Sequence, residues 1–68
     1  MTSSVRFAAR YYQLAAEHGH GIAQCNLGVC YELGLGVRTN LAEAKKWYRL
    51  AADQGNANAM QALQRLGY

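Results

Sequence analysis

Four side chains of this 68-residue chain belong to the types that bind metals or act as nucleophiles: His18, His20, Cys25 and Cys30. An HxH pair followed by a CxxxxC pair matches no standard zinc-ligand spacing. If the two cysteines share a helix, five residues place them about 140° apart around its axis, because each residue turns about 100°. The thiols then diverge, so we expect no metal site and no intrachain disulfide. Two reduced thiols, of which one or both are buried, agree with a reducing compartment.

Catalytic chemistry has equally little support in the sequence. These residues form no Cys/His/Asp arrangement typical of nucleophilic catalysis. The segment Gly34-Leu35-Gly36 lacks the third glycine, the preceding strand and the Lys-Ser/Thr ending of a phosphate-binding loop. We therefore interpret its glycines as turn residues, and we expect neither an enzyme nor a cofactor.

Length and composition indicate one small domain over residues 1–68. A chain of about 60 residues buries only about 60% of its unfolded surface, so we expect marginal stability. No run of about 18 apolar residues occurs, and the first residues lack the apolar stretch of a signal peptide. We therefore expect no membrane association and a cytoplasmic location. The net charge of +3 is too small to indicate a nucleic-acid partner.

Apolar spacing and glycine punctuation predict four helices joined by short connections. Ser4 is the expected N-cap of the first helix, and Asn40, with Glu43 three residues on, is that of the third. Gly19 and Gly34 are expected just beyond the ends of the first two helices. The expected helices cover residues 5–18, 22–33, 40–54 and 58–66. Their expected inner stripes are Val5, Ala8, Tyr12 and Ala15; Ala23, Leu27, Cys30 and Tyr31; Leu41, Ala44, Tyr48 and Ala51; and Ala59, Ala62, Leu63 and Leu66.

The chain nearly repeats itself at a displacement of 36 positions, because residues 8–32 align with residues 44–68. Such a fixed offset is typical of stacked helical units, which present surfaces for binding. The offset therefore favours binding over catalysis. The identical pairs are Ala8/Ala44, Tyr12/Tyr48, Leu14/Leu50, Ala15/Ala51, Ala16/Ala52, Gly19/Gly55, Ala23/Ala59 and Leu27/Leu63.

Residues 21–56 resemble the Sel1-like repeat, a relative of the tetratricopeptide repeat. The family pattern is A-x-x-x-L-G-x-x-Y, a G-x-G-V loop, and A-x-x-W-Y-x-x-A-A-x-x-G. Asn40 stands where the family usually has Asp, and the final segment departs from the pattern at Gln64 and Gly67. The matching residues are Ala23, Leu27, Gly28, Tyr31, Gly34, Gly36, Val37, Ala44, Trp47, Tyr48, Ala51, Ala52 and Gly55.

The resemblance implies an all-α fold, a right-handed α-solenoid of about two antiparallel helix pairs. In this register residues 5–19 are the second helix of a partial repeat, residues 20–55 a complete repeat, and residues 56–68 a first helix. Proteins similar to this family act as adaptors in protein complexes, often in bacteria. The positions that the family shares are packing positions, so the resemblance implies no catalytic residues.

By similarity to tetratricopeptide stacking, the first helices line a concave groove that binds a protein or peptide partner. We expect Leu27 and Leu63 to point into the core. The residues two positions before and two positions after each leucine, and those a turn further on, should then face the groove. The candidate partner-binding residues are Cys25, Val29, Glu32, Gln61, Arg65 and Tyr68.

Other interpretations remain open at this stage. With few repeats and no disulfide, the chain is a candidate structural self-assembly unit, either a homodimer or a fragment of a longer array. A small inhibitor or immunity-type protein fits the sequence equally well. Five basic residues, Arg6, Arg10, Lys45, Lys46 and Arg49, are expected on a solvated face that an acidic partner could use. The aromatic residues Tyr11, Trp47 and Tyr48 are expected to pack between helices.

Overall fold

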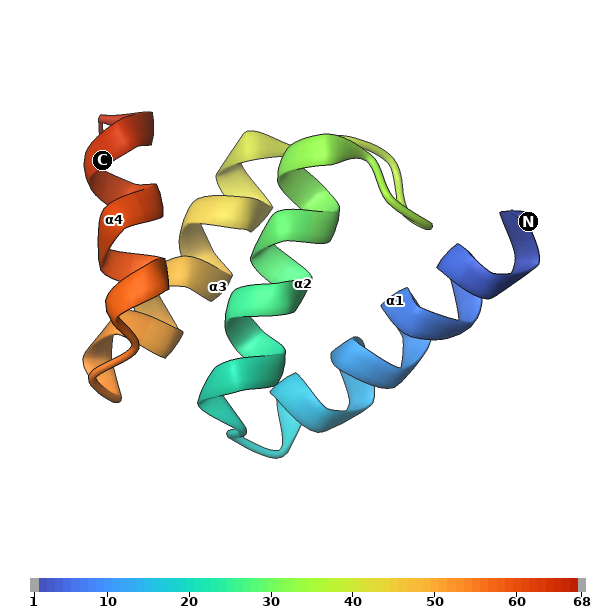
Figure 1. The fold of residues 1–68 in the computed structure, drawn as a ribbon, viewed down its shortest axis with the longest axis horizontal. Helices are drawn as coiled ribbons and strands as arrows, with labels where there is room; N and C mark the ends of the chain where they lie inside the picture. The colour runs from blue at the N-terminus through green and yellow to red at the C-terminus, as the bar shows by residue number, and fades with distance from the viewer. Residues whose placement is uncertain (1, 68) are drawn as a thin grey trace.

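Four α-helices make up the computed structural model, which describes residues 2–67, with side chains described from residue 6 onward. They are α1 (Thr2–Glu17), α2 (Gly21–Leu33), α3 (Leu41–Asp53) and α4 (Ala57–Leu66), joined by short connections (Figure 1). No strand occurs among these residues. The predicted all-α fold is confirmed, and the helix bounds agree with the predicted ones to within a few residues.

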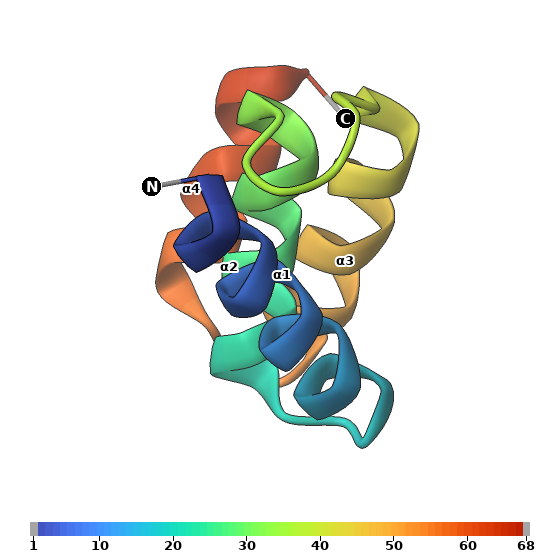
Figure 2. The same ribbon diagram turned by 90° about the vertical axis from the view of Figure 1, so that its right-hand side faces the viewer.

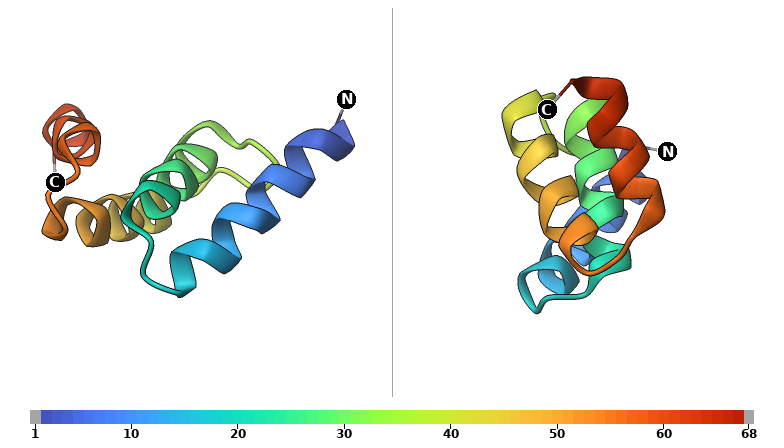
Figure 3. Two further views of the ribbon diagram at one scale, coloured as in Figure 1. Left: turned by 60° about the horizontal axis from the view of Figure 1, so that its bottom comes forward. Right: turned by 90° about the vertical axis from the view of Figure 1, so that its left-hand side faces the viewer.

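Helices that follow one another in the sequence are neighbours in space. Helix α1 packs on α2, α2 on α3, and α3 on α4, and the contact between α2 and α3 is the most extensive. Helices α2 and α4 lie on one side of the molecule, and α1 and α3 on the other (Figure 3). The chain thus zigzags between two helical layers, and α1 forms one end of the stack (Figure 2).

Asparagine side chains cap the two helices of the C-terminal half. The side chain of Asn40 accepts a hydrogen bond from the backbone N–H of Glu43 at 3.1 Å, which confirms the predicted cap of α3. Asn56 accepts one in the same way from the N–H of Ala59 at 2.9 Å. This second cap was not predicted, and it starts α4 one residue earlier than expected. Each cap satisfies a backbone donor that the first helical turn leaves without a partner.

The predicted cap of α1 is wrong. The helix begins at Thr2, so Ser4 lies inside it and does not precede it. The end of α1 is close to prediction, because the helix stops at Glu17 and Gly19 follows with φ of 88°. Gly55, the counterpart of Gly19 at the 36-residue offset, has φ of 89° after α3. The backbone therefore repeats the same left-handed turn where the sequence repeats the glycine.

The core consists of two clusters rich in alanine, which lets the helices approach closely. Tyr48 and Leu27 are the largest side chains that are fully buried. One cluster joins α2, α3 and α4, and contains Cys25, Ala44, Tyr48, Ala51, Ala59, Ala62 and Leu63. The other joins α1, α2 and α3, and contains Ala9, Ala16, Ala23, Leu27, Cys30 and Trp47.

The inner stripe predicted for α1 is wrong by one position. The fully buried residues are Ala9 and Ala16, whereas Ala8, Tyr12 and Ala15 are only half-buried. The residues predicted for α2 and α4 are buried or half-buried, and those for α3 are buried apart from Leu41, which is 48% exposed at the start of the helix. Val5 lies outside the residues whose side chains are described. On α3 the equivalent face packs between α2 and α4, whereas on α1 it packs only partly against α2, and no described helix precedes α1 to complete the cover.

The lack of a described helix before α1 also explains why Tyr11 is exposed. Trp47, its counterpart at the 36-residue offset, is 8% exposed in the core cluster with Ala9 and Leu27. Tyr11 is 69% exposed, so the expectation that it packs between helices is wrong. Trp47 reaches α1 and α2, which precede it in the stack, whereas no described element precedes α1.

Candidate interaction surfaces

The residues that first suggested chemistry do not form a site. Cys25 and Cys30 are both free and buried, as predicted, and they belong to different core clusters. Burial raises the pKa of each thiol, which disfavours the thiolate that would bind a metal or attack a substrate. His18 and His20 lie exposed at the turn between α1 and α2. Residues 2–67 contain no group of three His, Cys, Asp or Glu side chains able to hold a metal ion.

An ordered polar contact joins α2, α3 and α4. The carboxylate of Glu32 accepts a hydrogen bond from the hydroxyl of Tyr48 at 2.7 Å. It also accepts two from the guanidinium of Arg65, at 2.5 Å and 3.0 Å. The bonds from Arg65 and Tyr48 lower the pKa of Glu32. Burial, and next the hydrogen bond to Glu32, raise the pKa of Tyr48. Such a bidentate pair fixes the orientation of both side chains.

The six predicted binding residues take different positions. Cys25 is 8% exposed, so it is a core residue and not part of an open groove. Val29 is half-buried against the same cluster, and Glu32 is half-buried in its contact with Arg65. Gln61 and Arg65 are exposed on α4, and Tyr68 lies outside the described residues. The structure therefore brings Glu32 and Arg65 together. We call the accessible set Val29, Glu32, Gln61 and Arg65 the first-helix face.

A second polar network, which the sequence did not reveal, ties the ends of three helices together. The amide of Gln24, which is 5% exposed, donates to the carbonyl oxygen of Ala16 at 3.2 Å. The amide of Gln54 donates to Oε1 of Gln24 at 2.9 Å and to the carbonyl oxygen of Gly19 at 2.8 Å. These bonds satisfy a buried amide and hold the α1–α2 turn against the end of α3, so their role is structural.

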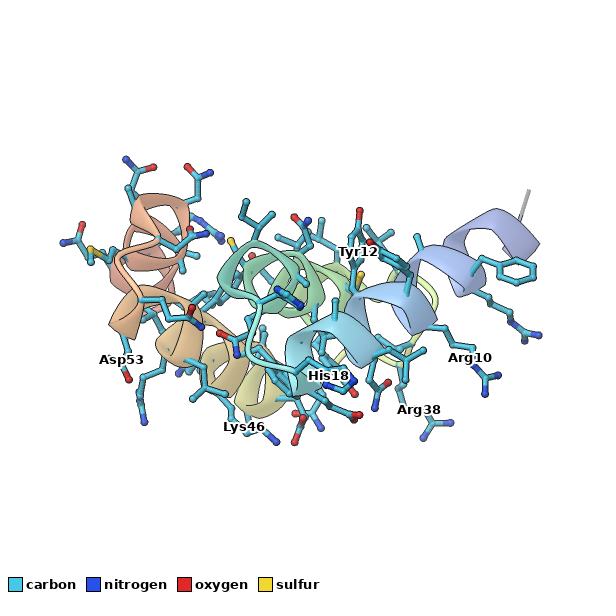
Figure 4. All side chains as sticks on the ribbon, turned by 90° about the horizontal axis from the view of Figure 1, so that it is seen from below. Arg10, Tyr12, His18, Arg38, Lys46 and Asp53 are labelled. Atoms are coloured by element: carbon cyan, nitrogen blue, oxygen red, sulfur yellow. The ribbon has the colours of Figure 1, made fainter. Side chains whose placement is uncertain are left out.

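A groove of about 440 Å³ lies between α1 and α2. Its walls include Tyr12 and Ala15 from α1, and Ile22 and Asn26 from α2. In Figure 4, which labels Tyr12, this side chain points toward the side on which α2 and α4 lie. The sequence could not reveal this groove, because the pattern of α1 predicts that Tyr12 and Ala15 are inner residues.

Three basic residues lie on the opposite side of the molecule. Arg10, Arg38 and Lys46 point away from the α2 and α4 layer (Figure 4). The ammonium of Lys46 lies 3.6 Å from the carboxylate of Glu43 and 4.9 Å from the centre of the Trp47 ring. This side is therefore a solvated polar surface in which at least one cation is already paired.

A zigzag of paired helices at a 36-residue offset defines an α-helical repeat protein. The model of the Sel1 repeat family matches residues 3–20 and 21–56, and the chain belongs to this family. No solved structure matches the chain with the statistical significance that the relatives described below reach. No helix in the described part of the chain is long and apolar enough to cross a membrane.

Curated relatives extend this assignment to eukaryotes and viruses. "DAP3-binding cell death enhancer 1" of Rattus norvegicus is 46% identical over 59 residues, which cover 87% of this chain and 12% of the relative. "Chitin synthase regulatory factor 1" of Schizosaccharomyces pombe is 43% identical over 56 residues, which cover 81% of this chain and 12% of the relative. "Putative sel1-like repeat-containing protein L18" of Acanthamoeba polyphaga mimivirus is 43% identical over 44 residues, which cover 65% of this chain and 8% of the relative. These sources give no support to the bacterial association expected from the resemblance.

Proposed function

We propose that this chain is a protein-interaction module that binds a protein or peptide partner through the first-helix face. Membership of the Sel1 repeat family supports this class of function, and so do the names of two relatives, one a binding protein and one a regulatory factor. The chain spans about 12% of the length of the rat relative, so activities of the whole relative are not transferred to it.

The observation that carries this proposal is the contact between Glu32 and Arg65. It fixes one guanidinium across α2 and α4, the two helices that also carry the half-buried Val29 and the exposed Gln61. A surface whose charged group is already oriented loses less side-chain entropy when a partner binds. The face combines one apolar side chain, one amide and one carboxylate–guanidinium pair, which suits a mixed polar and apolar peptide surface.

We place this function in a reducing compartment, the cytoplasm, because both thiols are free and lie in separate core clusters. We also propose the repeat register given above, with residues 20–55 as the complete unit. Because the rat relative is named for binding DAP3, DAP3 is the first defined bait to try.

The test compares capture of partners from native lysate by the wild-type chain and by a triple variant, Val29→Ala, Gln61→Ala and Arg65→Ala. A matched control, Leu50→Ala, Gln13→Ala and Arg38→Ala, changes the same numbers of apolar, amide and arginine side chains elsewhere on the surface. We expect the first variant to lose the captured partner and the control to retain it, with both helical by circular dichroism. Equal capture by all three folded proteins would eliminate the first-helix face as the binding surface.

A further inference from the structure

The layer formed by α1 and α3 carries the net charge of the chain. Helices α2 and α4 have one charged residue each, Glu32 and Arg65, and these two pair with each other. Of the seven basic and four acidic residues of the chain, six and three therefore lie on α1, on α3 and in the loop before α3, which leaves this layer with a charge of +3. Arg10, Lys46 and Asp53 point away from α2 and α4 (Figure 4). This side therefore attracts an acidic partner.

A hollow with the same type of border occurs twice on this layer. One of about 570 Å³ lies on α3, and one of about 320 Å³ lies on α1. Each residue that borders the α1 hollow has its counterpart at the 36-residue offset on the border of the α3 hollow. Three pairs keep their chemical type: Arg10/Lys46, Leu14/Leu50 and Glu17/Asp53. The fourth pair, Gln13/Arg49, adds a cation on α3. We call these eight residues the outer face.

Each hollow has an exposed leucine between a cation and a carboxylate. Leu14 is 62% exposed and Leu50 is 41% exposed. A cation lies four residues before each leucine and a carboxylate three residues after it, so all three share one side of the helix. Leu50 is exposed although α1 precedes α3 in the layer, and Leu14 is exposed although α3 follows α1 (Figure 3). A neighbouring helix on either side therefore leaves the leucine open to a partner.

Charge decides which partner fits. The α3 hollow is bordered by three cations, Lys45, Lys46 and Arg49, and by one carboxylate, Asp53. Among the side chains described from residue 6 onward, one ion pair lies in this layer, between Lys46 and Glu43. Two copies of this face would repel each other, so a second copy is disfavoured. The phosphates of a nucleic acid would meet the carboxylate without a hydrogen-bond donor, whereas a protein segment can supply carboxylates, an apolar side chain and a donor together.

We propose that the outer face binds an acidic segment of a partner protein, in which an apolar side chain follows carboxylates and precedes a hydrogen-bond donor. The carboxylates of the segment pair with Lys46 and Arg49. Its apolar side chain contacts Leu50, and its donor bonds Asp53. The hollow on α1 repeats the pattern, so it binds a second unit of the same kind. The outer face and the first-helix face lie on opposite sides of the molecule, so either proposal can fail alone.

The probe is a fluorescein-labelled peptide with four repeats of Glu-Glu-Leu-Gln, and fluorescence anisotropy measures its binding to the whole chain. We expect saturable binding that weakens at least about fivefold in about 0.5 M NaCl, because salt screens exposed charges. One matched peptide has glutamine in place of each glutamate, and another has serine in place of each leucine. Each should bind at least about fivefold more weakly, because one lacks the ion pairs and the other the apolar contact.

Variants of the chain test the same contacts from the other side. Leu50→Ala, and the double variant Lys46→Gln with Arg49→Gln, should each weaken binding of the glutamate peptide at least about fivefold. The double variant should also distinguish less between the glutamate and glutamine peptides, because both remove the same ion pairs. Leu33→Ala is the matched control for Leu50→Ala and should leave binding unchanged, because Leu33 is 61% exposed at the end of α2. The changed side chains are exposed, so each variant should keep the circular dichroism of wild type.

The lysate experiment separates the two surfaces. Its control variant removes Leu50 and Gln13 from the outer face, so a partner that this variant alone loses binds the outer face. A partner that only the first-helix variant loses binds the first-helix face.

Four results would overturn the proposal. The first is the absence of saturable binding of the glutamate peptide, and the second is equal binding of the glutamate and glutamine peptides. The third is tighter binding of a fluorescein-labelled oligothymidine with the same number of negative charges, because phosphates would then be the occupant. The fourth is a dimer of the chain, seen by light scattering without peptide, that Leu50→Ala dissociates, because a second copy would then cover the face.

Discussion

Gly28 of α2 lies directly against the ring of Tyr48 in α3, and a Cβ atom at Gly28 would fall 2.7 Å from two ring carbons. The ring is 1% exposed, so it has no free space into which it could move. At the 36-residue offset Tyr12 of α1 is the counterpart of Tyr48. Tyr12 borders the groove between α1 and α2.

Substitution of Gly28 should therefore destabilise the fold. Gly28→Ala gains about 1 kcal/mol of helix propensity, but overpacking of a filled core costs about 1–3 kcal/mol, and the rigid ring places this site at the upper end. We expect a net loss of about 1–2 kcal/mol in the free energy of unfolding, measured by urea denaturation. Gly21→Ala is the matched control, because its nearest contact is the flexible Gln54 side chain at 3.4 Å. Equal effects of the two substitutions would contradict a close contact at Gly28.

The contact of Glu32 with Arg65 and Tyr48 should make stability depend on acid pH. Both partners hold the pKa of Glu32 below its ordinary value in the folded chain. The carboxylate therefore contributes fully above its unfolded pKa of about 4.3, and the contribution is lost as pH falls through the lower folded pKa. We expect Glu32→Gln to be less stable than wild type at pH 7 and to approach wild-type stability in acid. Urea denaturation across this range measures the difference, and a gap that stays constant with pH would refute the carboxylate's role.

The glutamine network should act as one unit. Gln54→Ala leaves Oε1 of the buried Gln24 without its donor, and an unsatisfied buried polar group costs about 1–3 kcal/mol. We expect losses of about 1–2 kcal/mol for Gln54→Ala and for Gln24→Ala. The double variant should lose less than the sum, because each single change breaks the same bond. Gln13→Ala is the control, because the half-buried Gln13 bonds the exposed Glu17 of its own helix and takes no part in this network. Additive losses would show that the two amides act independently.

The local sequence carried most of the information about the helices. Asn40 and its Glu43 predicted the start of α3, and Ala44, Tyr48 and Ala51 predicted its buried face, because caps and apolar spacing act within one helix. The same reasoning failed on α1, where an equivalent stripe is only half-buried. Periodicity identifies a packing face but does not say whether another helix covers it.

The polar contacts of the candidate surface were beyond prediction for a related reason. Glu32 and Arg65 were assigned separately to one groove, and nothing local indicates that a residue of α2 binds one of α4 across 33 positions. Cys25 was placed on the groove because its spacing from Leu27 was known but the position of α4 was not. In the fold, α4 packs close enough to bury it. The distances between non-consecutive helices, which decide these contacts, emerge only from the three-dimensional packing.

Among residues 2–67, α1 has the packing face of a second helix but no helix that covers it as α2 covers α3, and the two equivalent tyrosines test this difference most directly. Truncation of a fully buried large aromatic costs about 3–5 kcal/mol, so Tyr48→Ala should remove most of the stability of a small domain. Tyr12→Ala should cost about 1–2 kcal/mol, because the Tyr12 side chain is only half-buried. The measurement is urea denaturation of both variants against wild type, followed by circular dichroism. A large loss for Tyr48→Ala with a small one for Tyr12→Ala is the predicted result, and equal losses would contradict the account.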